Sequence, residues 1–388
     1  MACANLDMYP VKHKVKIVSL TDLHMGNPRV QPAEVHEHLR RTFYPQLINN
    51  GVHLLAIVGD FFDTLLSLNS LAGYHSILIA KELLELAARE HFFIRVVRGT
   101  FSHDRHQNQL FLQSMENEQQ LIAGEPLVKV VDAVNIEHIK ALNIDLMYIP
   151  DDLPKMDIYQ VIEHQLKQVH LTQVDVILSH GYFEHLLPKG IPFFPPNTLS
   201  HRKIKQYVKG VVLNGHIHTA SVYKNIVSGG SFERFCHGEE DPKGFFIIEY
   251  DLTSHKCTFQ FVENKEAICF RKIDLTGEDI ESSAKKFAIL LTSLTEQYPN
   301  QRIYVQLVTD DLAVKQVLEL YTKQHFPDIL CSTRKVQVTN QMLDEIKFSV
   351  ADLPLITEQN LLDMVFEQLQ LKHLLYSKEE IEAVLNAA

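Results

Sequence analysis

The chain has 388 residues, of which 46% are hydrophobic and 22% charged, and its formal net charge at pH 7 is -11. This length allows one domain of roughly 250 residues and a smaller one, and the composition excludes a disordered or fibrous chain. The acidic balance argues against a protein that coats nucleic acid by charge alone, although it permits a local basic groove.

The segment from Met1 to Asp7 lacks a basic region followed by an apolar stretch, and no later segment approaches the roughly 20 apolar residues that span a bilayer. We therefore expect a cytoplasmic protein, in the host cytoplasm if its source is viral, with no membrane partner. Five cysteines without paired spacing indicate reduced thiols. The 21 histidines are of more interest, because imidazole is the commonest metal ligand.

Short runs rich in Val and Ile alternate with longer amphipathic segments along the first half of the chain. The runs are typical of buried strands, and each leads within a few residues to a polar turn, in most cases to an Asp or a His. The expected strands are Val15–Leu20, His53–Val58, Phe92–Val97, Val174–Leu178 and Val211–Leu213. The expected helices are Pro32–Ile48, Ser67–Glu90, Arg105–Ile122 and Met156–His170. This alternation predicts a layered α/β domain in which polar residues at the carboxyl ends of strands converge on one rim.

The pattern changes after Asn225. Short strands at Val227, Gly244–Tyr250 and Lys256–Val262 should complete a second sheet packed on the first. Helix and strand then alternate again, enough for a small α+β domain, in Glu278–Gln297, Ile303–Val308, Leu312–Gln324 and Ser332–Val338. Two amphipathic helices with Thr or Ser N-caps are expected at Thr357–Leu371 and Ser377–Leu385. We predict three parts, residues 1–265, 266–350 and 351–388.

Several of the polar residues after the expected strands suit a pair of metal ions. Two divalent ions about 4 Å apart supply the hydroxide and the charge neutralisation that phosphodiester hydrolysis needs at neutral pH. Asp22 and His24 are two residues apart after a strand, so both can point at one ion, and Asp60 is the natural bridging carboxylate. Three further imidazoles come from His180, His216 and His218.

Each of these pieces also has a purely structural interpretation. An Asp-x-His segment is most often a capped turn, and Gly-Asp after a strand is common turn chemistry. The occurrence of all the pieces in order, each after an expected strand, favours metal ligation.

The order of the motifs resembles that of the calcineurin-like metallophosphoesterase superfamily: Asp-x-His, Gly-Asp, Gly-Asn-His-Asp/Glu, His and Gly-His-x-His. The resemblance covers about Val15 to Asp251 and is closest to the SbcD-type double-strand-break nucleases. The segments that carry this closer resemblance are Gly59–Asp63, Tyr148–Pro150, Ser228–Arg234 and Glu239–Gly244. It implies a β-sandwich flanked by helices, a small α+β capping domain and C-terminal helices.

The resemblance also implies a ligand set. One ion would be held by Asp22, His24, Asp60 and His218, and the other by Asp60, His180 and His216. The third motif departs from the family, because residues 99–104 read Gly-Thr-Phe-Ser-His-Asp, which puts Ser102 at the position of the Asn ligand. A hydroxyl is a weaker donor than an amide carbonyl, so we expect the second ion to be held more loosely or completed by water. Alternatively, His103 is itself a ligand.

Three residues near the ligands are candidates for catalytic roles. We prefer His103 as the general acid that protonates the leaving oxygen, with Asp104 orienting its imidazole. Asp63 lies where some relatives have a His near the scissile phosphate; it either tunes the site or caps the start of a helix. The mixed carboxylate and imidazole set suits Mn²⁺ and tolerates Mg²⁺, Fe or Zn²⁺, and the resemblance implies two Mn²⁺.

The remaining segments point to partners. Ser67–Glu90 is apolar around much of its circumference, and the resemblance implies a homodimer through helices of this region; a deeply buried helix is the alternative. Residues 266–350 match the position of the family's capping domain, which contacts DNA, but no DNA-binding residue can be assigned. The helices of residues 351–388 are typical of a groove-docking element, for which family analogy gives an SbcC-type coiled-coil ATPase.

The sequence therefore predicts a Mn-dependent DNA exo/endonuclease that hydrolyses phosphodiester bonds at DNA ends in repair or recombination. A phosphatase or small-molecule phosphodiesterase on the same scaffold is one alternative, and a scaffold without metals is another. The C-terminal third favours the nuclease, because a small-molecule enzyme has no evident need for a cap and two amphipathic helices.

Overall fold

The computed structural model describes residues 13–113, 121–151, 157–187, 195, 197–299 and 301–335. The expected helices Thr357–Leu371 and Ser377–Leu385, and with them the groove-docking element, lie outside the described residues. The same holds for residues 336–350 of the expected small domain.

The first sheet has six strands in the order β14-β13-β1-β2-β3-β6. Their bounds are Lys14–Leu20 for β1, Leu54–Val58 for β2, Phe93–Val97 for β3, Val128–Val131 for β6, Gly244–Asp251 for β13 and Cys257–Glu263 for β14. The four strands β1, β2, β3 and β6 run parallel. The strands β2 and β3 are buried along their whole length, which explains their continuous apolar runs.

The expectation that Gly244–Tyr250 and Lys256–Val262 belong to the second sheet is wrong. As β13 and β14 they extend the first sheet, because β13 pairs antiparallel with β1 from Lys14↔Asp251 to Ser19↔Phe246. The strand β2 occupies only one edge of β1, and β13 supplies partners for the backbone groups of the other edge.

The second sheet has the order β11-β12-β10-β9-β8-β7. Its strands are β7 (Asn135–Ile139), β8 (Ile144–Ile149), β9 (Val174–His180), β10 (Val208–Gly215), β11 (Ser221–Tyr223) and β12 (Ile226–Ser228). The inner strands β8, β9, β10 and β12 are parallel, and β7 and β11 close the two edges antiparallel. A separate two-stranded sheet joins β4 (Leu121–Ile122) and β5 (Glu125–Pro126).

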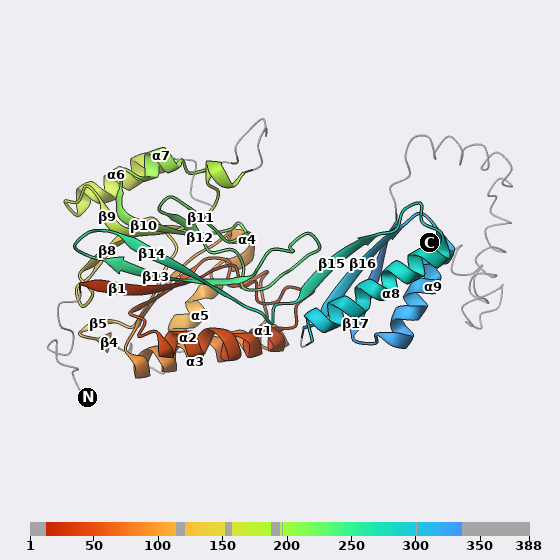
Figure 1. Ribbon diagram of the computed structural model, residues 1–388. Coiled ribbons are helices and arrows are strands. Elements are labelled where there is room, and N and C mark those ends of the chain that lie inside the picture. The colour runs from red at the N-terminus through yellow and green to blue at the C-terminus, as the bar shows by residue number, and fades with distance from the viewer. Residues whose placement is uncertain are drawn as a thin grey trace, which may run out of the picture. The chain divides into compact units, whose positions relative to one another are not determined.

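The two six-stranded sheets pack face to face and share one core. Side chains alternate along β9: Val176 and Leu178 join the core shared with the first sheet, whereas Ile177 belongs to the cluster on the opposite face. Helices α1 (Pro32–His38), α2 (Tyr44–Asn49), α3 (Leu71–Glu90) and α5 (Leu110–Gln113) lie on the first sheet, and α6 (Ile158–Gln168) and α7 (His201–Ile204) on the second (Figure 1). The expected layered α/β architecture is confirmed.

Two expected helices differ from the structure. Pro32–Ile48 forms α1 and α2 joined by a π-helical segment, Leu39–Phe43. Arg105–Ile122 is not one helix: its described residues form a 3₁₀ turn (Gln107–Gln109), α5 and, at its end, β4, and a short α4 (Phe101–Asp104) precedes it. Arg105 ends α4, because its φ of +49° lies outside the right-handed helical region.

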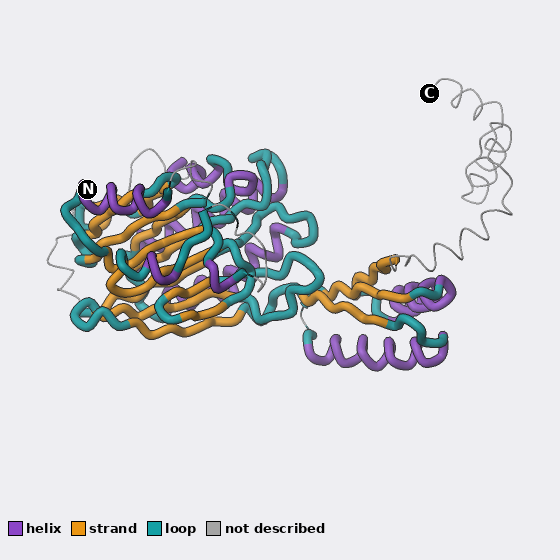
Figure 2. The backbone as a smooth tube through the Cα atoms, turned by 90° about the horizontal axis from the view of Figure 1, so that it is seen from above, coloured by secondary structure: helices purple, strands orange, loops and turns teal. Residues whose placement is uncertain are grey.

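A smaller group of elements follows β14. The strands β15 (Cys269–Asp274), β16 (Ile303–Thr309) and β17 (Ile329–Lys335) form a sheet in that order, accompanied by α8 (Ile280–Gln297) and α9 (Leu312–His325) (Figure 2). This group has its own apolar core, which includes Phe287, Leu291 and Val305. The strand β17 begins three residues earlier than expected. The boundaries at residues 265 and 350 stay predictions.

A membrane span was not expected from the sequence. Of the helices that the structure describes, none combines the length and the apolar character needed to cross a bilayer.

Candidate metal centre

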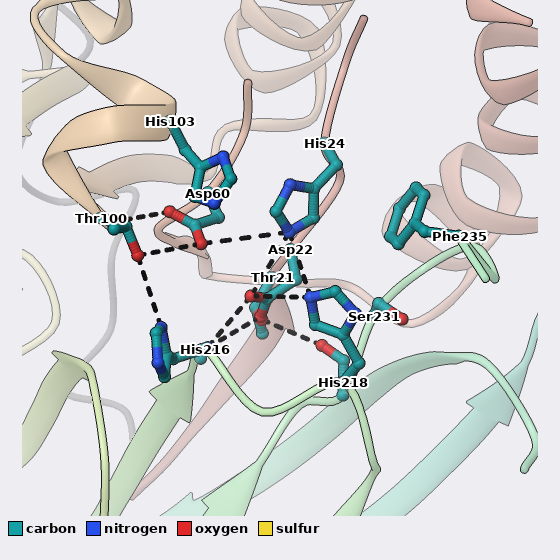
Figure 3. A network of polar contacts seen from close by, with 12 residues as sticks. Thr21, Asp22, His24, Asp60, Thr100, His103, His216, His218, Ser231 and Phe235 are labelled. Atoms are coloured by element: carbon teal, nitrogen blue, oxygen red, sulfur yellow. Dashed lines mark hydrogen bonds and ion pairs between the residues drawn. The ribbon is translucent and has the colours of Figure 1, made fainter. Parts of the chain in front are cut away.

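The carboxyl ends of strands from both sheets meet at one end of the sandwich. The strands β1 and β2 of the first sheet lead to Asp22 and Asp60, and β9 and β10 of the second end at His180 and Gly215, which are register partners. Side chains at the carboxyl ends of parallel strands converge in this way. Six of the seven residues predicted as ligands gather here in two clusters: Asp22, His24 and His218, and Asp60, His180 and His216. Within each cluster the candidate ligand atoms lie within 4.8 Å of one another. Figure 3 shows Asp22, His24, Asp60, His216 and His218 close together.

In the first cluster two imidazoles face each other. His24 Nε2 lies 3.1 Å from His218 Nε2, and Asp22 Oδ1 lies 4.0 and 3.9 Å from these two nitrogens. Two neutral ring nitrogens with facing lone pairs repel each other unless a proton or a cation lies between them. Two nitrogens that each bind one ion at about 2.1 Å are about 3 to 3.4 Å apart at ordinary coordination angles. The donor set of this cluster therefore fits a metal ion.

In the second cluster a hydrogen bond to a backbone carbonyl fixes the tautomer of His180. Its Nδ1 donates to the Val58 carbonyl oxygen at 2.8 Å, which leaves Nε2 as the nitrogen with a free lone pair. Nε2 is buried and lies 3.2 Å from Asp60 Oδ2, yet the contact lacks hydrogen-bond geometry, and Nε2 has no hydrogen-bond partner among the described residues. A bare ring nitrogen beside a carboxylate oxygen also fits a metal ion.

Asp60 lies between the two clusters. Its Oδ2 is 3.2 Å from His180 Nε2 on one side and 3.9 Å from His24 Nε2 on the other. Thr100 donates its backbone N–H to Asp60 Oδ1 at 2.6 Å and its hydroxyl to Oδ2 at 3.2 Å. The carboxylate is thus held in place where both clusters can share it.

Burial and charge shift the protonation of these groups strongly. Burial raises the pKa of Asp22 to about 6, partly offset by His180 and His218. Burial would also raise the pKa of Asp60, but the nearby charge of His180 outweighs it, so that this pKa falls well below its usual range. Burial would lower the pKa of His180, but Asp60 and Asp22 raise it to about 10. The buried carboxylates beside His180 therefore favour positive charge at this position.

The backbone at four of the candidate ligands has an energetically unfavourable conformation. Asp22, His24, Asp60 and His216 all have positive φ angles, of 50°, 48°, 47° and 90°. Such conformations are uncommon outside glycine and persist where surrounding contacts fix them. The His216 N–H donates to both carboxylate oxygens of Asp22 at 3.0 Å, and the His24 N–H donates to the Asp60 carbonyl at 3.0 Å. A side chain at Gly59 would place its Cβ 2.1 Å from His180 Nδ1, so only glycine allows this approach.

The seventh predicted ligand, Ser102, is not gathered with the others. Its side chain is exposed on α4. Thr100 takes the place expected of a neutral oxygen, because its hydroxyl reaches Asp60, lies 3.4 Å from His216 Nδ1 and lies 3.3 Å from Asp151 Oδ2. Thr100 directly follows Gly99, as Asn does in the Gly-Asn-His pattern, and this adjacency could have identified it.

His103 reaches the site, but Asp104 does not orient it. The partner of His103 Nδ1 is the Asp63 carbonyl oxygen at 2.5 Å, and the His103 ring packs edge-on against His24. The buried Asp104 carboxylate instead accepts the backbone N–H groups of Asp60, Phe62 and Gly99 and the side-chain amide of Asn108. The expected orienting role of Asp104 is wrong; it joins the loops that carry Asp60 and Thr100.

Asp63 faces the first cluster from behind. Its Oδ1 lies 3.1 Å from His24 Nδ1 and accepts a hydrogen bond from Asn27 Nδ2 at 3.0 Å. It does not cap a helix, since the next helix, α3, begins at Leu71 and has Ser70 as its N-cap. Glu239 stands behind His218 in a comparable way, with Oε1 3.2 Å from His218 Nδ1. Glu239 was not predicted as a site residue, because its distance of 21 residues from His218 gives no local pattern.

Comparison with known proteins gives no family. No family model and no curated protein matches the chain. One crystal structure aligns with 64% of this chain and all of its own, at 13% identity and a TM-score of 0.37. GAP50, the anchor in the inner membrane complex of Plasmodium, aligns over 66% of this chain and 86% of its own, at 14% identity and a TM-score of 0.38. Likeness of this degree identifies neither a family nor an activity.

Proposed function

We propose that the chain is a metallophosphoesterase that hydrolyses phosphodiesters with two divalent metal ions, Mn²⁺ being the preferred one. The observation that carries this proposal is the position of Asp60, whose Oδ2 faces His180 Nε2 at 3.2 Å and His24 Nε2 at 3.9 Å. A carboxylate between two sets of histidine and aspartate donors is what a pair of ions needs as its bridge. The order of motifs in the sequence supports the same superfamily.

Each residue then has a separate task. Asp22, His24, His218 and Asp60 would hold one ion, and Asp60, His180, His216 and the Thr100 hydroxyl the other. The bound ions would neutralise charge on a phosphate and activate a water molecule. His103 donates its Nδ1–H to the Asp63 carbonyl, so Nε2 is the nitrogen that would carry the second proton of the imidazolium form and give it to the leaving oxygen, which leaves the ring neutral.

DNA is the substrate that we favour, and the support for it is the resemblance to SbcD-type nucleases together with the second group of elements around β15–β17. Scission of DNA ends in repair or recombination is the corresponding task. A homodimer through the α3 region and an SbcC-type ATPase bound by residues 351–388 complete the proposal. A phosphatase, a small-molecule phosphodiesterase and a metal-free scaffold are the competing functions.

The decisive experiment compares three substrates. The purified protein is incubated with Mn²⁺ and end-labelled DNA, with a generic phosphodiester, or with a phosphomonoester. We expect cleavage of DNA and of the diester, abolished by chelation and by Asp60→Asn, which removes the bridging charge. Cleavage of the monoester alone would defeat the nuclease assignment, and a protein that binds no Mn²⁺ would defeat the metal centre.

A further inference from the structure

Glu239 lies behind one of the candidate ligands, on the loop that leads from β12 to β13. Its Oε1 accepts a hydrogen bond from His218 Nδ1 at 3.2 Å. The other carboxylate oxygen, Oε2, lies 3.1 Å from the Lys243 ammonium and accepts the Phe235 N–H at 3.4 Å. Both oxygens of Glu239 are thus held, so the carboxylate has a fixed orientation toward the imidazole.

Lys243 also contacts His218, at its backbone. Its side chain is buried, and its ammonium donates to the His218 carbonyl oxygen at 2.7 Å. Lys243 therefore connects the backbone of His218 with the carboxylate that contacts its ring. A buried lysine requires such anionic and carbonyl partners, which makes the arrangement rigid.

We infer that Glu239 is a positioning residue that fixes the His218 ring and makes the Asp22–His24–His218 position the tighter of the two ion positions. This inference rests on the proposed function. A carboxylate that accepts the far N–H of a metal-binding imidazole selects the tautomer, orients the other nitrogen and raises its basicity. In this chain the bond at Nδ1 directs His218 Nε2 toward His24 Nε2, 3.1 Å away.

Among the residues that the structure describes, none places an equivalent carboxylate within hydrogen-bond distance behind the imidazoles of the other ion position. His180 is backed by the neutral Val58 carbonyl, and His216 Nδ1 lies near the Thr100 hydroxyl. Asp151 accepts a hydrogen bond from the Thr100 hydroxyl at 3.3 Å, and its charge acts on His216. At the first position, Asp63 lies 3.1 Å from His24 Nδ1, although the contact is not aligned as a hydrogen bond. The two carboxylates that lie 3.1 and 3.2 Å from the outer ring nitrogens, those of Asp63 and Glu239, are thus both at the Asp22–His24–His218 position.

The test is a titration of the metal-free protein with Mn²⁺, followed by calorimetry and by the electron paramagnetic resonance of free Mn²⁺. We expect two binding steps of unequal affinity. Glu239→Gln should weaken the tighter step by about 10- to 100-fold and leave the weaker step unchanged. The glutamine side chain has one acceptor oxygen and one donor NH₂ group. Its NH₂ group would therefore face either the His218 N–H or the Lys243 ammonium, which are both donors.

Asp241→Asn is the matched control. Asp241 also contacts Lys243, at 3.3 Å, but its other partner among the described residues is Arg234, which donates to its carbonyl oxygen, so both steps should keep their wild-type affinities. Glu239→Asp keeps the charge and should fall between the wild type and Glu239→Gln; it replaces Glu239→Gln if melting in chelator shows that the glutamine variant does not fold.

The outcomes separate the two proposals. If the wild type binds no Mn²⁺, the proposed function fails. If the wild type binds two ions and the Glu239 variants bind both with unchanged affinity, only the positioning role fails. Equal affinities of the two wild-type steps would also overturn the inequality inferred here.

Discussion

Thr100 and Ser102 are two residues apart and carry the same functional group, yet only one hydroxyl reaches the candidate metal centre. The Thr100 hydroxyl contacts Asp60 and lies near His216, whereas Ser102 is exposed on α4. The conformation of the chain, and not the residue type, decides which hydroxyl is available.

This difference predicts the behaviour of a pair of variants. Thr100→Val removes the hydroxyl but keeps the backbone N–H bond to Asp60, and it should weaken the ion at Asp60, His180 and His216 by roughly tenfold or more. Ser102→Ala should leave metal binding and turnover unchanged. Mn²⁺ titration of both variants checks this, and a loss confined to Ser102→Ala would reverse the assignment.

His103 should matter for turnover and not for metal binding. Its Nδ1 is engaged by the Asp63 carbonyl, and a general acid contributes a factor of about 10² to 10⁴ in rate. We expect His103→Ala to lose a factor of this size in kcat on end-labelled DNA while it retains both ions by elemental analysis. A protein that loses an ion together with its activity would identify His103 as a ligand.

Residue by residue, the site could be predicted where a motif is continuous and follows a strand. The pairs Asp22 and His24, and His216 and His218, are of this kind, and the structure brings them together. The partner of His103 could not be predicted, because Asp104 is adjacent in sequence but turns toward the N–H groups of Asp60 and Gly99. Nor could Glu239, whose contact with His218 depends on the path of a loop.

Among the elements, β3 and β7 are joined by an ion pair between the two sheets. Arg95 on β3 is fully buried, and its guanidinium donates to both carboxylate oxygens of Glu137 on β7, at 3.0 and 2.9 Å. The Tyr148 hydroxyl on β8 donates to the same carboxylate. Removal of one partner leaves an uncompensated buried charge.

Glu137→Gln should therefore lower the free energy of unfolding by about 3 to 5 kcal/mol, measured by urea denaturation. The exposed pair Lys14 and Glu249 provides the control, and Glu249→Gln should change stability little. Burial would raise the pKa of Glu137, but the charge and hydrogen bonds of Arg95 outweigh it and lower this pKa below 4.5.

The sign of the pH dependence follows from that lowered pKa. The stabilisation by Glu137 is present above pH 4.5, the ordinary value, and is lost as the pH falls through the lower folded-state pKa. The stability difference between the wild type and Glu137→Gln should thus shrink on acidification below pH 4.5. A difference that stays constant down to pH 2 or so would contradict this origin.

At the level of elements, strands with strong apolar runs such as β2 and β9 could be predicted from sequence. The strands β4 to β8 were missed, and β7 shows why: four of its five residues are only partly buried or exposed, so no clear alternation marks it. The pairing of β13 with β1 joins residues more than 200 positions apart, and no local pattern specifies such a partner.

For the whole molecule, the surface near the start of α3 is the feature that points to a partner. The helix buries Ile79, Leu83 and Leu86 on its inner side, so it is neither wholly buried nor wholly exposed. Its first turn and the preceding loop expose large apolar side chains: Leu65 (60%), Leu68 (59%), Leu71 (60%) and Tyr74 (55%). Apolar side chains exposed together are typical of an interface.

We expect the wild type to be a dimer in light scattering and Leu68→Glu with Leu71→Glu to be a monomer, because two buried carboxylates per subunit would oppose association. Leu330→Glu, at another exposed leucine, is the control and should keep the dimer. A wild-type mass that stays monomeric at all concentrations would remove α3 as an interface.

The left-handed backbone at Asp22, His24, Asp60 and His216 should lower the thermal stability of the protein, although the side chains at these positions serve the proposed metal centre. Glycine at position 24 would relieve about 1 kcal/mol or more of conformational strain while it deletes an imidazole. Variants selected only for thermal stability should accordingly accumulate substitutions at these four positions. Such variants should have a higher melting temperature and no metal-dependent hydrolysis. The frequency of such substitutions after selection for thermal stability, compared with their frequency after selection for phosphodiester cleavage, would measure how much stability these residues cost in return for the proposed activity.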